Sequence, residues 1–250
     1  MKFMNPRHCA WGIHTVQETN QHGDGSVAIA LVVKTIDQVD NCVEVAWRLA
    51  VHRHEGLTVV AVVSGSMAET LDIDSDAVSL EAEGELVNAL YKATSSSVLL
   101  GRNDPDTPQL ILRKVQAAKP IAHVQQELER LEPTLVIIPN DGRNDNEERT
   151  VGQQLLKHCR FPIMAISGTF PSVFNRVLVP YAPGDHTVRA LSLAHDLAIA
   201  FDGQLTLLHF VPASVEHGDE VGRRTLLRVL KKANIEVDER VDIRVVETDS

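Results

Sequence analysis

The sequence predicts an α/β fold: an open, doubly wound parallel sheet of five strands, followed by a partial second copy of the same unit. Three observations predict it. Apolar, β-branched runs alternate with amphipathic helical segments along the chain. The runs 29–33 and 177–181 are apolar along their length, which is typical of parallel strands buried on both faces. Finally, segment 29–63 aligns without a gap with segment 177–211.

The repeat has the same order of elements in both copies: a strand, a polar loop, a helix and a second strand. Asp37 aligns with Asp185, and Leu57-Thr58 aligns with Leu205-Thr206. One face of the second helix is expected to carry Val188, Leu191, His195, Ala198 and Phe201. Gly203 follows this helix as its expected C-cap. Each copy is therefore predicted to be a right-handed βαβ unit.

The elements that follow in each copy are predicted from periodicity and from breaker residues. In the first copy they are a helix at 76–94, weakened by Gly84, a strand at 110–117, a helix at 121–131, a strand at 134–139, a helix at 152–159 and a strand at 162–166. In the second copy they are a helix at 219–233 and a strand at 241–247. The predicted organisation is an N-terminal tail at 1–25, a first domain at 26–168, a linker at 169–175 and a partial second domain at 176–250.

The second copy has no counterpart of the fourth strand, the last helix and the fifth strand of the first copy. Two explanations are open. The natural product continues after Ser250, which we favour, or the half-domain covers its exposed sheet by association with another protein surface.

Composition narrows the class of protein. A formal net charge of −10 and a pI near 5.5 argue against a nucleic-acid partner, because affinity for phosphate backbones needs a concentrated basic face. No apolar stretch approaches the roughly 20 residues that span a bilayer, and the N-terminus lacks a signal-peptide core. Cys9, Cys42 and Cys159 have no CxxC spacing. They are expected to be reduced thiols of a cytoplasmic protein without a metal site or membrane insertion.

Several stretches resemble one known family. RVLVPYAPGDHTVRALSLAHDLA (176–198) and GQLTLLHFV (203–211) resemble the opening of the universal stress protein family, and LVIIPNDG with KHCRFPIMAI resembles its closing half. The resemblance covers about 26–250, in a tandem form with an incomplete second domain. It implies a Rossmann-like fold and a role in stress tolerance. Some members bind ATP and others do not, and the module also occurs fused to membrane transporters as a cytoplasmic regulatory part.

The resemblance also implies where ATP would bind. ATP-binding members carry Gly, two residues, Gly, nine residues, Gly and then Ser or Thr, so that backbone N–H groups and a hydroxyl reach the phosphates. Gly142 and Gly152 match this spacing. Pro139 stands in place of the first glycine and lacks an N–H, and Gln153 stands in place of the hydroxyl residue.

The charge of this loop and the end of the first strand differ from the family pattern too. Between Asn140 and Val151 there are four acids and two bases, which would repel a triphosphate. The family's nucleoside-facing Asp is replaced by Lys34 in the first copy and by Ala182 in the second. The degenerate ATP loop is expected to consist of Lys34, Asn140, Gly142, Arg143, Gly152 and Gln153. We expect weak or absent ATP binding and no other cofactor.

Isolated candidates for chemistry have simpler interpretations. His52 and His54 point to different sides of a helix, so we interpret them as a solvated helix end rather than a metal pair. His195 aligns with Trp47, which favours a packing role, and Cys159 is expected to be buried as a small apolar residue. The basic segment 223–232 is predicted to pack on the second sheet rather than lie on a membrane.

The sequence contains none of the patterns GxxxxGK, GxSxG or HExxH, so we expect no catalysis. The favoured hypothesis is a non-enzymatic universal stress protein that acts by association and forms a homodimer through the edge strand Pro162 to Ile166. The alternatives are a cytoplasmic regulatory domain of a membrane transporter and an ATP-binding stress protein.

Overall fold

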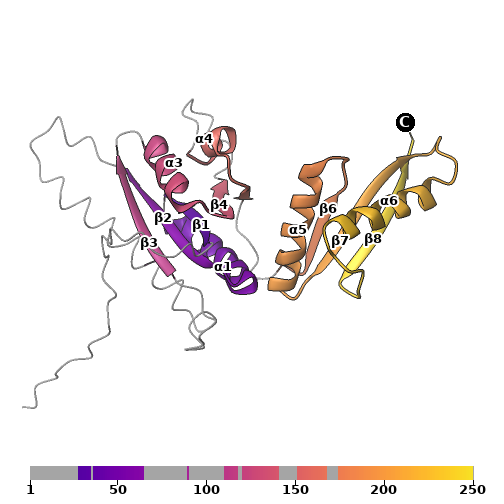
Figure 1. Cartoon of the computed structure of the whole chain (residues 1–250), viewed down its shortest axis with the longest axis horizontal. Helices are drawn as coiled ribbons and strands as arrows, with labels where there is room; N and C mark the ends of the chain where they lie inside the picture. The colour runs from indigo at the N-terminus through magenta and orange to yellow at the C-terminus, as the bar shows by residue number, and fades with distance from the viewer. Residues whose placement is uncertain are drawn as a thin grey trace, which may run out of the picture.

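The computed structural model describes residues 28–34, 36–64, 89, 110–117, 120–140, 151–167 and 174–249. These residues form two sheets with helices packed on them (Figure 1). In chain order the elements are β1 (Ala28–Val33), α1 (Ile36–Arg53), β2 (Gly56–Ser64), β3 (Leu110–Ala117), α3 (Pro120–Leu131), β4 (Leu135–Asn140), α4 (Val151–His158), β5 (Ile163–Ser167), β6 (Arg176–Pro180), α5 (Asp185–Ala200), β7 (Gln204–Pro212), α6 (Gly218–Lys232) and β8 (Val241–Thr248). The predicted helix at 76–94 lies outside the described residues except for Ala89, which is helical.

The first unit, β1 to β5 with α1, α3 and α4, is built on a five-stranded parallel sheet in the order β3-β2-β1-β4-β5. Every residue of β1 is buried because the strand has a neighbour on each side and helices on each face. Ile29 and Leu31 contribute to the cluster under α1, whereas Ala30 and Val32 contribute to the cluster under α3 and α4. Alternate residues thus face two apolar layers, which explains the unbroken apolar run. The predicted fold class is confirmed.

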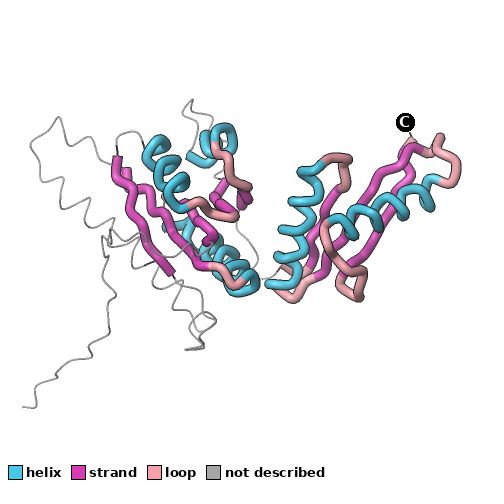
Figure 2. The backbone as a smooth tube through the Cα atoms, in the orientation of Figure 1, coloured by secondary structure: helices cyan, strands magenta, loops and turns pink. Residues whose placement is uncertain are grey.

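The second unit, β6 to β8 with α5 and α6, is built on a three-stranded parallel sheet in the order β6-β7-β8. Figure 2 shows both of its helices against the strands. The basic helix α6 packs on the sheet as predicted: Gly222, Leu226 and Leu230 are buried, while Arg223 and Arg228 are exposed. Its basic residues are therefore on the outer face of a core-packing helix.

The two units share the register that the repeat predicts. Ala28 pairs with Gly56 between β1 and β2, and Arg176 pairs with Gln204 between β6 and β7. The alignment of segment 29–63 with segment 177–211, extended by one residue at its start, places Ala28 on Arg176 and Gly56 on Gln204. Under this alignment the β1–β2 pair and the β6–β7 pair therefore have the same register.

Helix α5 buries two faces rather than the single face predicted. Leu191 and Ala198 pack in the core of the second unit, but Leu197 and Phe201 belong to the cluster under α1. At about 100° per residue, Phe201 has rotated well away from Leu191 and lies nearer to Leu197. The assignment of Phe201 to the same face as Leu191 was wrong, and the second face joins α5 to α1.

Gly203 is not the C-cap of α5. The cap is Phe201, and Asp202 takes the left-handed conformation with φ of 52°. The Gly203 N–H donates to the Ala198 carbonyl at 2.7 Å. A Cβ at Gly203 would collide with the carbonyl oxygen of Phe174. The glycine is therefore required for the close approach of the chain that enters β6, and not for a positive φ.

Candidate functional site

The order of strands in the first sheet reverses between β1 and β4, and ligands of open α/β sheets bind outside the carboxyl ends of the strands at such a point. Leu31 of β1 pairs with Ile137 of β4. Continuing this register to the ends of the strands puts Lys34 level with Asn140. Two of the predicted site residues are therefore brought together at this edge, and Lys34 is exposed there.

Helix α4 brings two more predicted residues to the same edge. It connects the parallel strands β4 and β5, so its first turn lies at their carboxyl ends. Gly152 and the exposed Gln153 occupy that first turn, while Leu155 is fully buried and anchors the helix on the sheet. Gly142 and Arg143 lie outside the described residues, as do the four acids of the loop.

The residues at this edge supply few groups for chemistry. The described residues at or just after the carboxyl ends of the five strands are Lys34, Ser64, Ala117, Asn140 and Ser167. None of them is an acid, a histidine or a cysteine. Pro139, next to Asn140 in β4, has no N–H to offer a ligand. The side chains described at this edge are thus the Lys34 amine, the Ser167 hydroxyl and the Gln153 amide in the first turn of α4.

The corresponding edge of the second unit is built differently. Ala182 is exposed, and its carbonyl accepts a hydrogen bond from the Thr187 hydroxyl at the start of α5. The Tyr181 ring meets the His209 ring edge to face, with centroids 5.0 Å apart. The described residues of this unit contain no strand on the other side of β6. They therefore form no second reversal of strand order.

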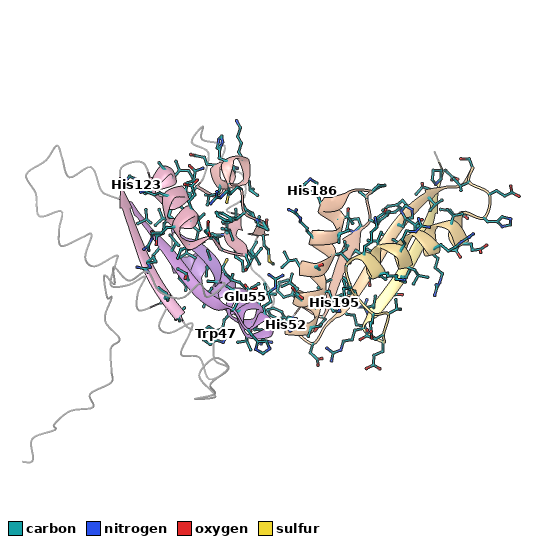
Figure 3. The ribbon with its side chains drawn as sticks, in the orientation of Figure 1. Trp47, His52, Glu55, His123, His186 and His195 are labelled. Carbon is teal, nitrogen blue, oxygen red and sulfur yellow. The ribbon has the colours of Figure 1, made fainter. Side chains whose placement is uncertain are left out.

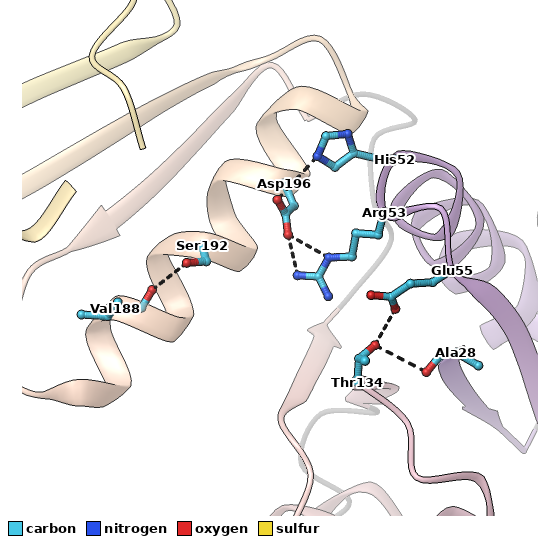
Figure 4. Close-up of polar contacts among 8 residues, drawn as sticks. All are labelled: Ala28, His52, Arg53, Glu55, Thr134, Val188, Ser192 and Asp196. Atoms are coloured by element: carbon cyan, nitrogen blue, oxygen red, sulfur yellow. Dashed lines mark hydrogen bonds and ion pairs between the residues drawn. The ribbon is translucent and has the colours of Figure 1, made fainter. Parts of the chain in front are cut away.

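A polar network lies at the amino ends of the strands of the first sheet (Figure 4). The Thr134 hydroxyl donates to Glu55 Oε2 at 2.5 Å, and the Thr134 N–H donates to the Ala28 carbonyl at 3.1 Å. These residues join the starts of β1, β2 and β4. The network holds the amino ends of the strands together, at the opposite end of the sheet from Lys34 and Asn140, so its role is structural.

Sequence reasoning missed a cluster between α1 and α5 (Figure 4). Arg53 Nε and Nη2 donate to Asp196 Oδ2 at 2.8 and 2.5 Å, and His52 Nε2 lies 3.5 Å from Asp196 Oδ1. The His52 side chain is 27% exposed, so its interpretation as a solvated helix end was wrong. The available signal was α1 itself, which is apolar around most of its circumference and therefore needs a second partner besides its sheet.

The other isolated candidates have ordinary environments. His54 is exposed beyond the end of α1, and His195 is half-buried in α5. Cys159 is half-buried against the core under α3, so it is less buried than predicted. In Figure 3 His123 and His186 lie apart from each other and from His52 and His195, and in the part of the chain that the structure describes no three metal-ligating side chains come together. No helix within that part is both long and apolar enough to cross a membrane.

Known proteins with this architecture were found by structure alone. No family model matches the chain, and neither does any curated protein. A universal stress protein from Archaeoglobus fulgidus is 18% identical, with a TM-score of 0.53 over 88% of this chain and 77% of its own. A second universal stress protein, described as putative, from Pseudomonas aeruginosa is 15% identical, with a TM-score of 0.52 over 88% and 74%. The fold is that of the universal stress proteins.

The resemblance drawn from the sequence is thus confirmed at the level of the fold. A universal stress protein from Archaeoglobus fulgidus in complex with dAMP also matches, at 15% identity over 56% of this chain and 97% of its own. Its TM-score is 0.38.

Proposed function

We propose that this chain is a tandem universal stress protein that acts without catalysis, through association, and whose nucleotide site is degenerate. The observation that carries the proposal is the universal stress protein fold over 88% of the chain, combined with the register that its two units share. We assign an N-terminal tail to 1–25, the first domain to 26–168, the linker to 169–175 and a partial second domain to 176–250. Both sheets lie within the two assigned domains.

The proposed degeneracy of the site rests on three residues at the reversal point. Lys34 stands where ATP-binding relatives place a nucleoside-facing Asp, and it offers a donor where an acceptor is needed. Pro139 removes an N–H at the position of the first glycine. Gln153 is exposed in the first turn of α4, where a Ser or Thr hydroxyl would reach a phosphate. ATP binding is weak or absent in this proposal, and no other cofactor is required.

The absence of catalysis is proposed from the same edge. General acid–base and nucleophilic catalysis need a carboxylate, an imidazole, a thiol or an activated amine or hydroxyl within reach of the substrate. The residues described at the carboxyl ends of the five strands include no carboxylate, imidazole or thiol that could act as a base. The acidic charge and the thiols expected to be reduced support a cytoplasmic location.

Association is proposed through β5, the edge strand of the first sheet. The Pro162 carbonyl accepts a hydrogen bond from the Val136 N–H at 2.9 Å, so the even-numbered residues of β5 face β4. Ile163 and Ala165 therefore direct their backbone groups to the open edge. An unpaired strand edge is a template for pairing with a second copy.

Light scattering at tens of micromolar tests this proposal. We expect a particle with twice the 27.5 kDa mass of the chain. A monomer across this concentration range would count against association through β5.

A further inference from the structure

The contact between the two units is made by the α1 contact face (Arg48, His52 and Arg53) and the α5 contact face (Asp196, Leu197 and Phe201). At one end of the contact, the Arg53 guanidinium is hydrogen-bonded to the Asp196 carboxylate. At the other end, the Arg48 guanidinium lies over the Phe201 ring, 4.7 Å from its centroid. Each helix thus contributes one residue at each end of the contact: Arg53 and Asp196 at one end, Arg48 and Phe201 at the other.

The repeat relates these two ends to each other. In the alignment that places Ala28 on Arg176, Arg53 falls on Phe201 and Arg48 falls on Asp196. The Arg53–Asp196 pair and the Arg48–Phe201 pair therefore join the same two positions, with the roles of the helices exchanged. Equivalent helices meet about a local two-fold axis, as identical subunits do in an isologous dimer.

The side chains at these positions break the symmetry of the contact. Two α1 helices in this geometry would place Arg48 of one against Arg53 of the other, at both ends. Two α5 helices would place each Asp196 against a Phe201 ring, which leaves both carboxylates without a cation across the contact. Only α1 against α5 gives each guanidinium a favourable partner on the facing helix, a carboxylate at one end and an aromatic face at the other.

The partial burial of these side chains increases the energetic difference between pairing α1 with α5 and pairing α1 with a second α1. The side chains of Arg53 and Asp196 are 20% and 24% exposed, so their interaction is less screened than that of a surface pair. Arg48 is held by Glu44 of its own helix at 2.8 Å, but its Nε is buried and has no hydrogen-bond partner among the described residues. Like charges forced together in such surroundings are costly, and this cost is a means of rejecting a wrong partner.

We propose that the α1 contact face is selective: it accepts α5 and rejects a second copy of α1. The partner that fits it is a helix with a carboxylate and, five residues later, an aromatic ring. The C-terminal unit of the chain thereby covers the α1 contact face with a helix of complementary charge. The surface is distinct from the β5 edge, so this inference stands independently of the proposed homodimer.

One substitution is expected to make α1 favour a second copy of α1 over α5. Arg53→Asp places a carboxylate against Asp196 within the chain. It also makes α1 self-complementary, because the carboxylate introduced at position 53 of one copy would meet Arg48 of another at both ends. Arg53→Ala removes the pair with Asp196 without making α1 self-complementary, and it is the matched control. The reversed pair, Arg53→Asp with Asp196→Arg, restores the contact within the chain.

The test is the concentration dependence of the mass of the full chain by sedimentation velocity. We expect Arg53→Asp to show an additional association step. Its dissociation constant should be at least about tenfold lower than that of any such step in Arg53→Ala. The reversed pair should abolish this step. Equal association of Arg53→Asp and Arg53→Ala would overturn the proposal, and so would a reversed pair that associates as Arg53→Asp does.

Hydrogen exchange of the α5 amides gives a second readout, which applies even if Arg53→Asp does not fold. Arg53→Ala, Asp196→Ala and the double variant form a cycle on the full chain. Each substitution alone should raise the exchange rate of the α5 amides. Adding Asp196→Ala to Arg53→Ala should raise this rate by less than half as much as Asp196→Ala does in the unsubstituted chain, because Arg53→Ala has already broken the pair. Asp242→Ala breaks the exposed Arg244–Asp242 pair of β8 and should leave these amides unchanged. Additive effects of the two alanine substitutions would contradict the proposal.

Discussion

Replacing Phe201 by alanine is expected to lower the free energy of unfolding by about 3 kcal/mol or more. The side chain is 3% exposed and belongs to the cluster that joins α1, β1 and β2 to α5. Its ring meets the Phe174 ring edge to face at 4.7 Å and supports the Arg48 guanidinium. The substitution would leave a cavity where the two units meet. Urea unfolding followed by circular dichroism measures the loss.

Phe210→Ala is the matched control for this prediction. Phe210 is 50% exposed on β7, where it alternates with the buried residues that face the helices. Its replacement is expected to cost about 1 kcal/mol or less. Equal losses for the two phenylalanines would mean that the contact between α1 and α5 contributes little to stability.

The substitution Ala165→Pro is expected to convert the proposed homodimer into a monomer, with the dissociation constant raised at least about 100-fold. Ala165 is exposed, and its N–H points to the open edge of β5, so proline removes a donor needed by a second strand. The ladder to β4 uses the neighbouring residues and should persist. Light scattering over a dilution series measures the change.

Ala165→Val is the control for this substitution, because valine keeps the N–H and has a high β-propensity. It should dimerise as the unsubstituted chain does. A Pro variant that also stays dimeric would place the interface away from β5.

Much of the fold could be predicted from the pattern of apolar residues. The run at 110–117 coincides with β3, and the period of the segment at 121–131 placed α3 to within one residue. Such signals are local, because the spacing of apolar residues within one segment predicts whether a strand or one face of a helix is buried. The ungapped alignment of the two copies then predicted that the units are equivalent, and the shared register of their strands agrees with it.

The contact between the units could not be predicted in the same way. An apolar helix face reveals that it will be buried, but not against which element. Arg53 and Asp196 look like solvated charges on separate helices, and only the fold brings them within hydrogen-bonding distance. Gly203 was misassigned for a related reason, since a glycine after a helix has the same appearance whether it caps the helix or admits a neighbouring backbone.

The positions of two candidate residues along the sheet could be predicted, because they depend on the strand register. Lys34 follows β1 and Asn140 ends the adjacent parallel strand β4, so their proximity at the reversal point is a consequence of the predicted topology. The loop carrying Gly142 and Arg143 lies outside the described residues, and its expected effect on phosphate binding stays a prediction.

Calorimetric titration with Mg-ATP tests the proposed degeneracy of this site most directly. The full chain is compared with a variant that restores the family pattern, Lys34→Asp with Pro139→Gly and Gln153→Ser. For the unsubstituted chain we expect a dissociation constant weaker than about 1 mM, and for the restored variant at least about tenfold tighter binding, because an N–H and a hydroxyl again reach the phosphates. A micromolar site in the unsubstituted chain would contradict the account.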